Sequence, residues 1–291
     1  MRPEVGASVQ HRDRSGTTAL VTGATSGVGR ELAFALGRLG ADVLVHGRDR
    51  EAGEAVAAEL RETGSEASFL RADYADLDQV ENLAERVRGR VDGLDVLVNN
   101  AGAHADDGRI ADSGVEWTLH VNHLAPFLLT NRLREDLAGG RVVTVASEVH
   151  RRADLDLAGA ASVDGYDGFD AYARSKLANV LFARELARRD DDVASVACHP
   201  GFVPSSGLWR NASLPVRAVM RVLSAVPRGL TFGYVDSPAS AAVTPTYLAA
   251  GEDLEDGAYY RDCRVVEPAD PATDDDLADR LWEWSADRVD R

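Results

Sequence analysis

The chain has 291 residues, of which 45% are hydrophobic and 27% are charged. This composition can bury a core, so it excludes a disordered chain, a collagen and a coiled coil. Acidic residues outnumber basic ones by 48 to 32, and the formal net charge is −16. Phosphate backbones and acidic lipid repel such a chain, so we expect neither a nucleic acid nor a membrane as partner.

Cysteine is scarce: Cys198 and Cys263 are too few for a disulfide framework or a metal-ligand cluster, so no metal site is expected. Residues 1–16 are expected to form a polar N-terminal arm. Met1–Arg14 carries three arginines and no apolar core, unlike a signal peptide or an anchor. No other stretch approaches the ~20 apolar residues of a membrane helix, and we expect a soluble, cytoplasmic protein.

From Thr17 onward, short apolar runs alternate with longer amphipathic stretches. The runs that predict strands are Thr18–Val21, Asp42–His46, Ala67–Arg71, Leu94–Val98, Val142–Ala146 and Val193–Ala197, with a weaker one near Ala258–Arg261. The stretches that predict helices are Gly29–Leu39, Arg50–Glu62, Leu77–Val87, Val115–Leu137 and Ala171–Arg189. Strands made of nearly continuous Val and Leu are buried on both faces. We therefore predict an α/β fold: one Rossmann-like domain over residues 17–291, with a doubly wound parallel sheet flanked by helices on both faces.

Two segments interrupt the alternation, Arg151–Phe169 and Pro204–Val235. Irregular segments of this length are commonly functional, and both follow the carboxyl ends of strands, where open α/β sheets bind ligands. The second segment is rich in apolar residues, and we expect it to act as a lid over about 204–235. Its apolar side chains suit a pocket for a lipophilic ketone or alcohol, or else core or interface packing. They are Leu208, Trp209, Leu214, Val216, Val219, Met220, Val222 and Leu223.

A glycine turn, Thr22–Gly29, joins the first strand to the first helix. Glycines there let the backbone approach a pyrophosphate closely, and the helix N-terminus attracts its negative charge. The strand, turn and helix in succession favour a dinucleotide site over a plain turn. The residues expected to bind the cofactor are Gly23, Thr25, Ser26, Gly27, Val28 and Gly29.

Cofactor choice is predicted at the end of the second strand, where an acidic residue would bind the ribose of NAD. Arg48 stands there with a guanidinium suited to a 2′-phosphate, and Asp49 suits the N-cap of the helix from Arg50. NADP(H) is therefore favoured. NAD(H) stays open if Arg48 is a solvated turn residue and Asp49 binds the ribose. After the third strand, Asp73, followed by Tyr74, either binds the adenine amino group or leads into the next helix.

Lys176 is the only lysine in the chain, and Tyr172 lies four residues before it on a predicted helix. Residues four apart share one helix face, so the ammonium can lie beside the Tyr172 hydroxyl or a cofactor ribose. Moving a tyrosine pKa from ~10 to near neutrality takes roughly 4 kcal/mol, which one cation ~4 Å away supplies only in a partly closed site. We predict Tyr172 as general acid/base, with its pKa lowered by Lys176; the alternative is a coincidence on a solvated helix. Tyr166 is a weaker candidate, because Asp170 would raise its pKa.

Taken together, the glycine turn, Asn99-Asn100-Ala101-Gly102 and Tyr172-Ala-Arg-Ser-Lys176 resemble the short-chain dehydrogenase/reductase family over nearly the whole chain. The run Ser175–Ala187 and the tail Tyr260–Arg264 are most similar to retinol dehydrogenases and WW-domain oxidoreductases. The resemblance implies that Asn100, Ala101, Gly102, Tyr172 and Lys176 contact the cofactor. It also allows a homodimer or homotetramer.

By the same resemblance, Ser147 and Asn122 complete a catalytic tetrad with Tyr172 and Lys176. Ser147 would donate to the substrate oxygen, and Asn122 would hold a water linked to the lysine. The alternatives are a strand-end serine and an asparagine at a helix kink near Pro126. The turn after the sixth strand resembles the family's nicotinamide-binding turn, although Ser205 stands where the family often has threonine, and His199 is interpreted as structural. The residues implied there are Pro200, Gly201, Val203 and Ser205.

These observations favour an NADP(H)-dependent oxidoreductase that interconverts an alcohol and a carbonyl in a small, apolar substrate. The alternative is a non-catalytic NADP(H)-binding regulator or scaffold on the same fold. An epimerase or dehydratase is disfavoured because the chain lacks a second, sugar-nucleotide-type domain. The excess of carboxylates and the scarcity of lysine also suit a halophilic source.

Overall fold

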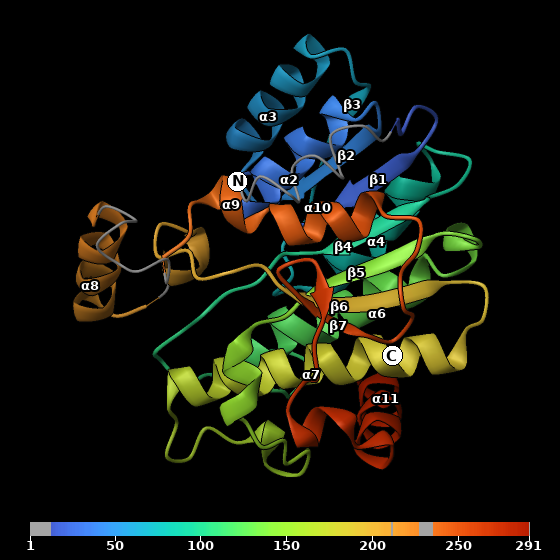
Figure 1. Cartoon of the computed structure of the whole chain (residues 1–291). Helices are drawn as coiled ribbons and strands as arrows, with labels where there is room; N and C mark the ends of the chain where they lie inside the picture. The colour runs from blue at the N-terminus through green and yellow to red at the C-terminus, as the bar shows by residue number, and fades with distance from the viewer. Residues whose placement is uncertain (1–12, 211, 227–234, 291) are drawn as a thin grey trace.

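The computed structural model describes residues 13–210, 212–226 and 235–290. Its sheet has eight strands in the order β3-β2-β1-β4-β5-β6-β7-β8 (Figure 1). The strands β1 to β7 run parallel, and β8 pairs antiparallel with β7. Their bounds are Thr18–Val21 (β1), Asp42–Gly47 (β2), Ala67–Arg71 (β3), Val96–Asn99 (β4), Arg141–Val145 (β5), Ala194–His199 (β6), Tyr259–Arg261 (β7) and Arg264–Val265 (β8).

Helices cover both faces of this sheet, which confirms the predicted Rossmann-like α/β fold. One apolar cluster joins the sheet to α4, α6, α7 and α11, and a second joins it to α2, α3 and α10. Neighbouring residues of β1 divide between the two: Leu20 packs in the first, and Ala19 and Val21 pack in the second. The bounds are Gly27–Arg38 (α2), Arg50–Glu62 (α3), Leu77–Arg88 (α4), Trp117–Leu119 (α5), Ala125–Arg132 (α6), Gly168–Arg189 (α7), Leu214–Ala225 (α8), Pro238–Ala241 (α9), Val243–Ala250 (α10) and Asp275–Val289 (α11).

The helix predicted over Val115–Leu137 is broken. The segment Trp117–Leu119 (α5) leads into a π-helical turn over His120–Leu124, which continues as α6. Pro126 has no N–H to offer the carbonyl of Asn122 four residues earlier, so regular α-helical bonding cannot continue there. Asn122 is therefore held at an irregular turn in the middle of the fold.

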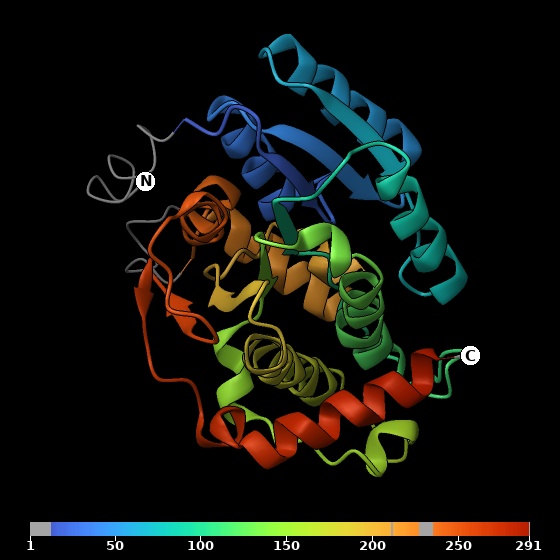
Figure 2. The same cartoon turned by 90° about the vertical axis from the view of Figure 1, so that its right-hand side faces the viewer.

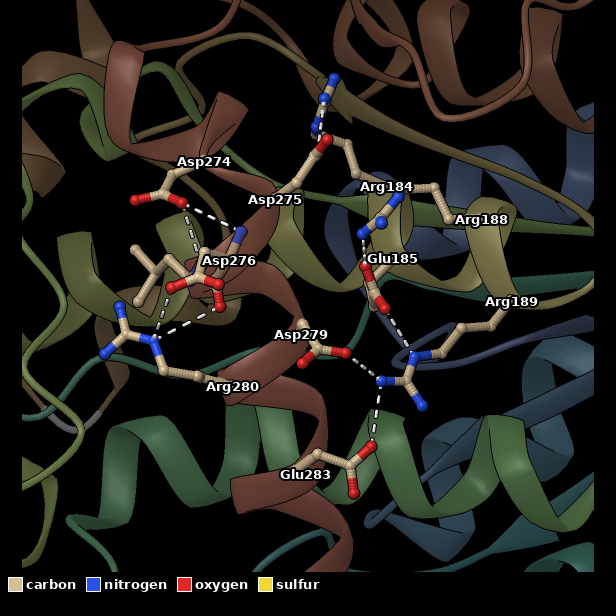
Figure 3. Close-up of polar contacts among 11 residues, drawn as sticks. Arg184, Glu185, Arg188, Arg189, Asp274, Asp275, Asp276, Asp279, Arg280 and Glu283 are labelled. Atoms are coloured by element: carbon tan, nitrogen blue, oxygen red, sulfur yellow. Dashed lines mark hydrogen bonds and ion pairs between the residues drawn. The ribbon is translucent and has the colours of Figure 1, made fainter.

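The two helices α7 and α11 lie against each other, as the turned view in Figure 2 shows. Glu185 of α7 is buried and accepts from Arg188 and Arg189 of the same helix at 2.5 Å each. Arg189 also bonds Asp279 and Glu283 of α11, and Figure 3 shows these contacts side by side. Charge pairs therefore bind the C-terminal helix to the helix that carries Tyr172.

Candidate active site

A cavity of about 600 Å³ lies at the carboxyl ends of the parallel strands. It runs from the glycine turn after β1 to Tyr172 and Lys176 on α7. The predicted site residues that line it are Gly23, Thr25, Ser26, Gly27, Val28, Gly29, Arg48, Asp73, Tyr74, Asn100, Ala101, Gly102, Ser147, Tyr172, Lys176, Pro200, Gly201 and Val203. The structure thus brings together residues that are far apart in sequence. Asn122 and Ser205 are the two predicted residues that do not line the cavity; the neighbouring Ser206 does.

The glycine turn fits a phosphate group. Gly23 and Gly27 have φ of 65° and 60°, a conformation that other residues avoid. A side chain at Gly29 is excluded, because its Cβ would lie 2.4 Å from Nδ2 of Asn100. At the start of α2, the N-cap Ser26 makes no side-chain capping bond, which leaves the first amides of the helix for an anion.

Four of the longer helices are capped from within the protein, whereas α2 and the exposed α8 are not. Aspartate side chains accept from the first-turn amides of α3, α4, α7 and α11. Thr22 and Asn100 then hold the glycine turn in place: Thr22 Oγ1 accepts from the amides of Asn100 and Ala101 at 3.0 Å, and Asn100 Nδ2 donates to Thr22 O at 2.7 Å. The residues present therefore fit the pyrophosphate of a dinucleotide.

Arg48 and Asp73 both line the cavity, and Nη1 of Arg48 lies 3.7 Å from Oδ2 of Asp73. Asp49 accepts from the Ala52 amide as the N-cap of α3, as predicted. Asp73 accepts from the Ala75 amide, so it also shapes the turn that leads to α4. The ring of Tyr74 stacks on His46 at 4.8 Å between centroids. Among these residues, Arg48 offers the partly exposed positive charge that a 2′-phosphate would need.

Tyr172 and Lys176 are both buried on the cavity side of α7. The Lys176 Nζ atom lies 5.6 Å from the centroid of the Tyr172 ring and donates to Val145 O at 2.8 Å. Burial lowers the pKa of Lys176 to about 8 and raises the pKa of Tyr172 above its ordinary value. Burial therefore shifts the pKa of Tyr172 in the direction opposite to the one expected from Lys176, because the cost of burying the phenolate dominates for this pair of side chains.

Ser147 follows β5 and lines the cavity near Tyr172. Asn122 lies behind the cavity wall. Its Oδ1 accepts from Ala103 N at 2.7 Å, and its Nδ2 donates to Ala103 O and to Ser175 Oγ at 2.9 Å each. The side chain of Asn122 thus fastens the loop after β4 to α7, which fixes the distance between the cofactor-side backbone and Lys176.

Tyr166, the rival tyrosine, makes no contribution to this cavity. Its hydroxyl contacts Ala105 O at 3.0 Å and Glu116 Oε1 at 3.2 Å. Burial and the Glu116 carboxylate raise the pKa of Tyr166 to about 12. The expected rise in the pKa of Tyr166 is confirmed, but the carboxylate in contact with its hydroxyl is that of Glu116 rather than that of Asp170.

One backbone hydrogen bond joins the residues that flank the two ends of the lid: the Asp236 amide donates to Phe202 O at 2.7 Å. Between them, Gly207–Arg210 forms a short 3-10 helix, and its Leu208 and Trp209 line the cavity. Leu208 O accepts from the His104 amide at 3.3 Å, which ties this part of the lid to the loop after β4.

Of the alternatives given for the apolar lid residues, α8 neither lines the pocket nor packs in the core, and interface packing stays a prediction. None of its residues is buried, and it stands apart from the sheet in Figure 1. Leu214 and Val222 are 76% and 66% exposed. Part of the predicted lid, residues 211 and 227–234, lies outside the described residues, as do residues 1–12 of the predicted N-terminal arm.

Sequence reasoning missed several residues of the cavity wall, including Glu148, Arg152 and Phe169. Glu148 accepts from the Tyr259 hydroxyl at 2.9 Å and pairs with two arginines. Burial alone would raise the pKa of Glu148, but these partners hold it below its usual range. His199 ends β6 and accepts from the Glu148 amide at 3.4 Å, consistent with a structural role. No local pattern marks these residues, because their partners come from distant segments.

The chain belongs to the short-chain dehydrogenase/reductase family of oxidoreductases, because the short chain dehydrogenase profile matches residues 17–213. Within that family it is of the retinol dehydrogenase-like subgroup. It is 35% identical over 291 residues to mouse retinol dehydrogenase 14, covering 93% of this chain and 85% of the relative. It is 39% identical over 287 residues to a protein of Streptomyces sp. (strain C5) provisionally named daunorubicin C-13 ketoreductase DnrU. That match covers 96% of this chain and 94% of the relative.

A solved structure adds a cofactor to the comparison. A short chain dehydrogenase from Burkholderia cenocepacia, in complex with NADP, superposes with a TM-score of 0.64 at 27% identity, covering 81% of this chain and 91% of that one. Among the described residues of the present chain, no helix combines the length and apolarity needed to span a bilayer.

Proposed function

We propose that the protein is an NADP(H)-dependent oxidoreductase that interconverts a carbonyl and an alcohol, with Tyr172 as general acid/base. The observation that carries this proposal is one continuous cavity whose wall contains the uncapped start of α2 at one end and Ser147, Tyr172 and Lys176 at the other. Arg48 and the NADP complex of the Burkholderia relative support the phosphorylated cofactor.

The cofactor, when bound, supplies the hydride that reduces the carbonyl carbon, or accepts it in the reverse direction. Tyr172 gives its hydroxyl proton to the carbonyl oxygen as the carbon–oxygen double bond opens. Ser147 would donate a hydrogen bond to the same oxygen, and Lys176 would hold the ribose through the N–H groups not bonded to Val145. Burial keeps the pKa of Tyr172 raised, so the phenol holds its proton at neutral pH, the form needed for carbonyl reduction.

The apolar cavity wall near Leu208 and Trp209 supports an apolar substrate. The test follows NADPH oxidation with a panel of aldehydes and ketones, against charged sugars as comparison. We expect apolar carbonyl compounds to turn over faster. Tyr172→Phe should lower kcat by at least about 100-fold while leaving the Kd for NADPH within about threefold.

Two results would reject the proposal. NADPH binding without turnover of any carbonyl compound would favour the non-catalytic regulator, and product formation without net NADPH consumption would favour an epimerase or dehydratase. Full activity in Tyr172→Phe would remove Tyr172 from the reaction.

A further inference from the structure

The first part of the lid passes beside the glycine turn. A Cβ built at Gly27 would lie 3.9 Å from Cα of Ser206. One built at Gly207 would lie 3.5 Å from Oγ of Ser26. Ser26 and Gly27 are the N-cap and the first residue of α2, the point that fits the pyrophosphate of a dinucleotide. All four of these residues line the same cavity, so this part of the lid borders the anion site.

Arg210 brings a positive charge to this border. It is the last residue of the 3-10 helix Gly207–Arg210, and its guanidinium folds back along that helix, because its Nη2 lies 3.3 Å from the position of a Cβ at Gly207. That position is therefore close to both Nη2 of Arg210 and Oγ of Ser26. Gly207 has no side chain to fill the space between these two atoms. A phosphate group with one oxygen bonded to each of them has the size to span it.

The 3-10 helix is fixed to the body of the protein, which holds Arg210 at the cavity. Trp209 is buried, with its ring 5.2 Å from that of His104, and Leu208 O accepts from the His104 amide at 3.3 Å. The side chain of Arg210 is exposed and lines the cavity. No carboxylate pairs with it in the part of the chain that the structure describes, so its charge is available to a ligand.

The other arginine and lysine side chains of the cavity wall, Arg48, Arg152 and Lys176, serve other places. Arg48 is at the proposed 2′-phosphate position, and Lys176 lies beside Tyr172 on α7. Arg152 ends the 3-10 helix that follows β5, at the reacting end of the cavity. The start of α2 offers only about half a positive charge, whereas each phosphate of a pyrophosphate carries a negative one. Arg210 is placed to supply the additional positive charge.

We infer that Arg210 binds the pyrophosphate of the cofactor from the lid, opposite the amides at the start of α2. The inference rests on the proposed NADP(H)-dependent function and assigns to it a binding residue outside the glycine turn. The contact is independent of the 2′-phosphate. Arg210 therefore contributes equally to the binding of NADPH and NADH, whereas Arg48 discriminates between them.

The test measures the Kd of NADPH and of NADH by fluorescence titration in the unaltered protein and in Arg210→Met, which keeps a long side chain and removes the charge. We expect both Kd values to rise by the same factor, about tenfold at low salt. The third ligand, 2′-AMP, carries a 2′-phosphate and no pyrophosphate. Its Kd, measured by displacement of NADPH, should stay within about twofold. Arg48→Asp should give the opposite pattern, a loss for NADPH and 2′-AMP but not for NADH.

Salt dependence and a second arginine separate a charge contact from a change in the shape of the lid. Because Arg210 is exposed, the loss in Arg210→Met should shrink as KCl rises from about 0.05 M to about 1 M. Arg217→Met is the matched control, because Arg217 is an exposed arginine of the same lid that lies on α8 and does not line the cavity. Its Kd values for both nucleotides should match those of the unaltered protein.

Unchanged Kd values in Arg210→Met, or a loss confined to NADPH and 2′-AMP, would overturn the inference and leave the proposed oxidoreductase function intact. An equal loss in Arg217→Met would also overturn it, since the charge of the lid rather than a contact would then be responsible. So would a loss that is the same at both salt concentrations, since it would come from the shape of the lid. An unaltered protein that binds neither nucleotide contradicts the proposed function itself.

Discussion

Arg48 is the residue on which cofactor preference depends. Its guanidinium is partly exposed and its only close carboxylate is Asp73, 3.7 Å away, within the described ranges of the chain. A charge-assisted hydrogen bond to phosphate contributes about 1.5–3 kcal/mol, so Arg48→Asp should weaken NADPH binding by about 10- to 100-fold and leave NADH binding equal or stronger. Fluorescence titration of both nucleotides measures this. Arg50→Ala, two residues away at the start of α3, is the control, and unchanged NADPH affinity in Arg48→Asp would refute the assignment.

Lys176 reduces the stability of the fold that it serves. Burial lowers its pKa from 10.5 to about 8, so the unfolded chain binds the proton more strongly. At about 1.4 kcal/mol per pH unit, this costs on the order of 3 kcal/mol below pH 8, and the cost fades as the pH rises toward 10.5. Lys176→Met should therefore raise the free energy of unfolding at pH 7 by about 1–3 kcal/mol while abolishing turnover.

Urea unfolding of both proteins at pH 7 and pH 10 checks this expectation for Lys176→Met. The gain should be largest at pH 7 and fall to about a quarter of that value at pH 10. A variant that is less stable than the parent at pH 7 would show that the bond from Nζ to Val145 outweighs the cost of burying the charge.

The sequence alone locates residues whose role depends on other residues nearby in the chain. The glycine turn and the pair Tyr172 and Lys176 follow from spacing within one turn of chain, and the structure places them in one cavity. His104 and Glu148 could not be found in this way. Their partners, such as Trp209 and Tyr259, are far along the chain, so only the folded structure brings them together.

At the level of elements, Glu185 is buried on α7 and pairs with Arg189, which in turn pairs with residues of α11. It is 3% exposed and bonded to Arg188 and Arg189, whereas Glu283, which also pairs with Arg189, is 63% exposed. Glu185→Ala should lower the free energy of unfolding by about 1–3 kcal/mol, and Glu283→Ala by less than about 1 kcal/mol. Urea unfolding measures both, and equal losses would mean that burial of Glu185 adds nothing.

The type of an element was predictable where a long segment keeps a regular hydrophobic period. An example is α3, whose bounds match the prediction. Several elements escaped prediction, among them β8, α9 and α10. The strand β8 follows a two-residue turn in which Asp262 and Cys263 have φ of 55° and 60°, and the sequence lacks the glycine that usually marks such a turn. Hydrophobic period does not report the break in the helix around Asn122, but Pro126 indicated it, and the alternative of a helix kink near Pro126 is confirmed.

At the scale of the whole molecule, buried histidines set the response to acid. Burial lowers the pKa of His46 to about 4 and of His123 to about 3. The unfolded chain then binds more protons than the native one below pH 6.5, so stability should fall as the pH drops, by about 1.4 kcal/mol per unit for each histidine. Urea unfolding at pH 6.5 and pH 5 tests this, with His123→Gln expected to have the shallower loss. The same loss in both proteins would contradict the account.

The net charge of −16 makes salt a second variable for the whole fold. At about 1 M salt the screening length is only ~3 Å, so repulsion among surface carboxylates is largely removed. We expect the Tm to rise between 0.1 M and 1 M KCl, as the proposed halophilic source requires. A flat Tm over this range would reject that source.

The backbone bond between Asp236 and Phe202, which joins the two ends of the lid, has an evolutionary consequence. Because the two ends of the lid meet at this bond, outside the sheet, the stretch between them can be exchanged for a longer or shorter one without a change in the register of any strand. The entropy of closing such an excursion grows only with the logarithm of its length, about 0.6 kcal/mol for each doubling. Replacement of the lid can thus change which substrates the pocket accepts during evolution, while Ser147, Tyr172 and Lys176, which lie outside the lid, keep their positions.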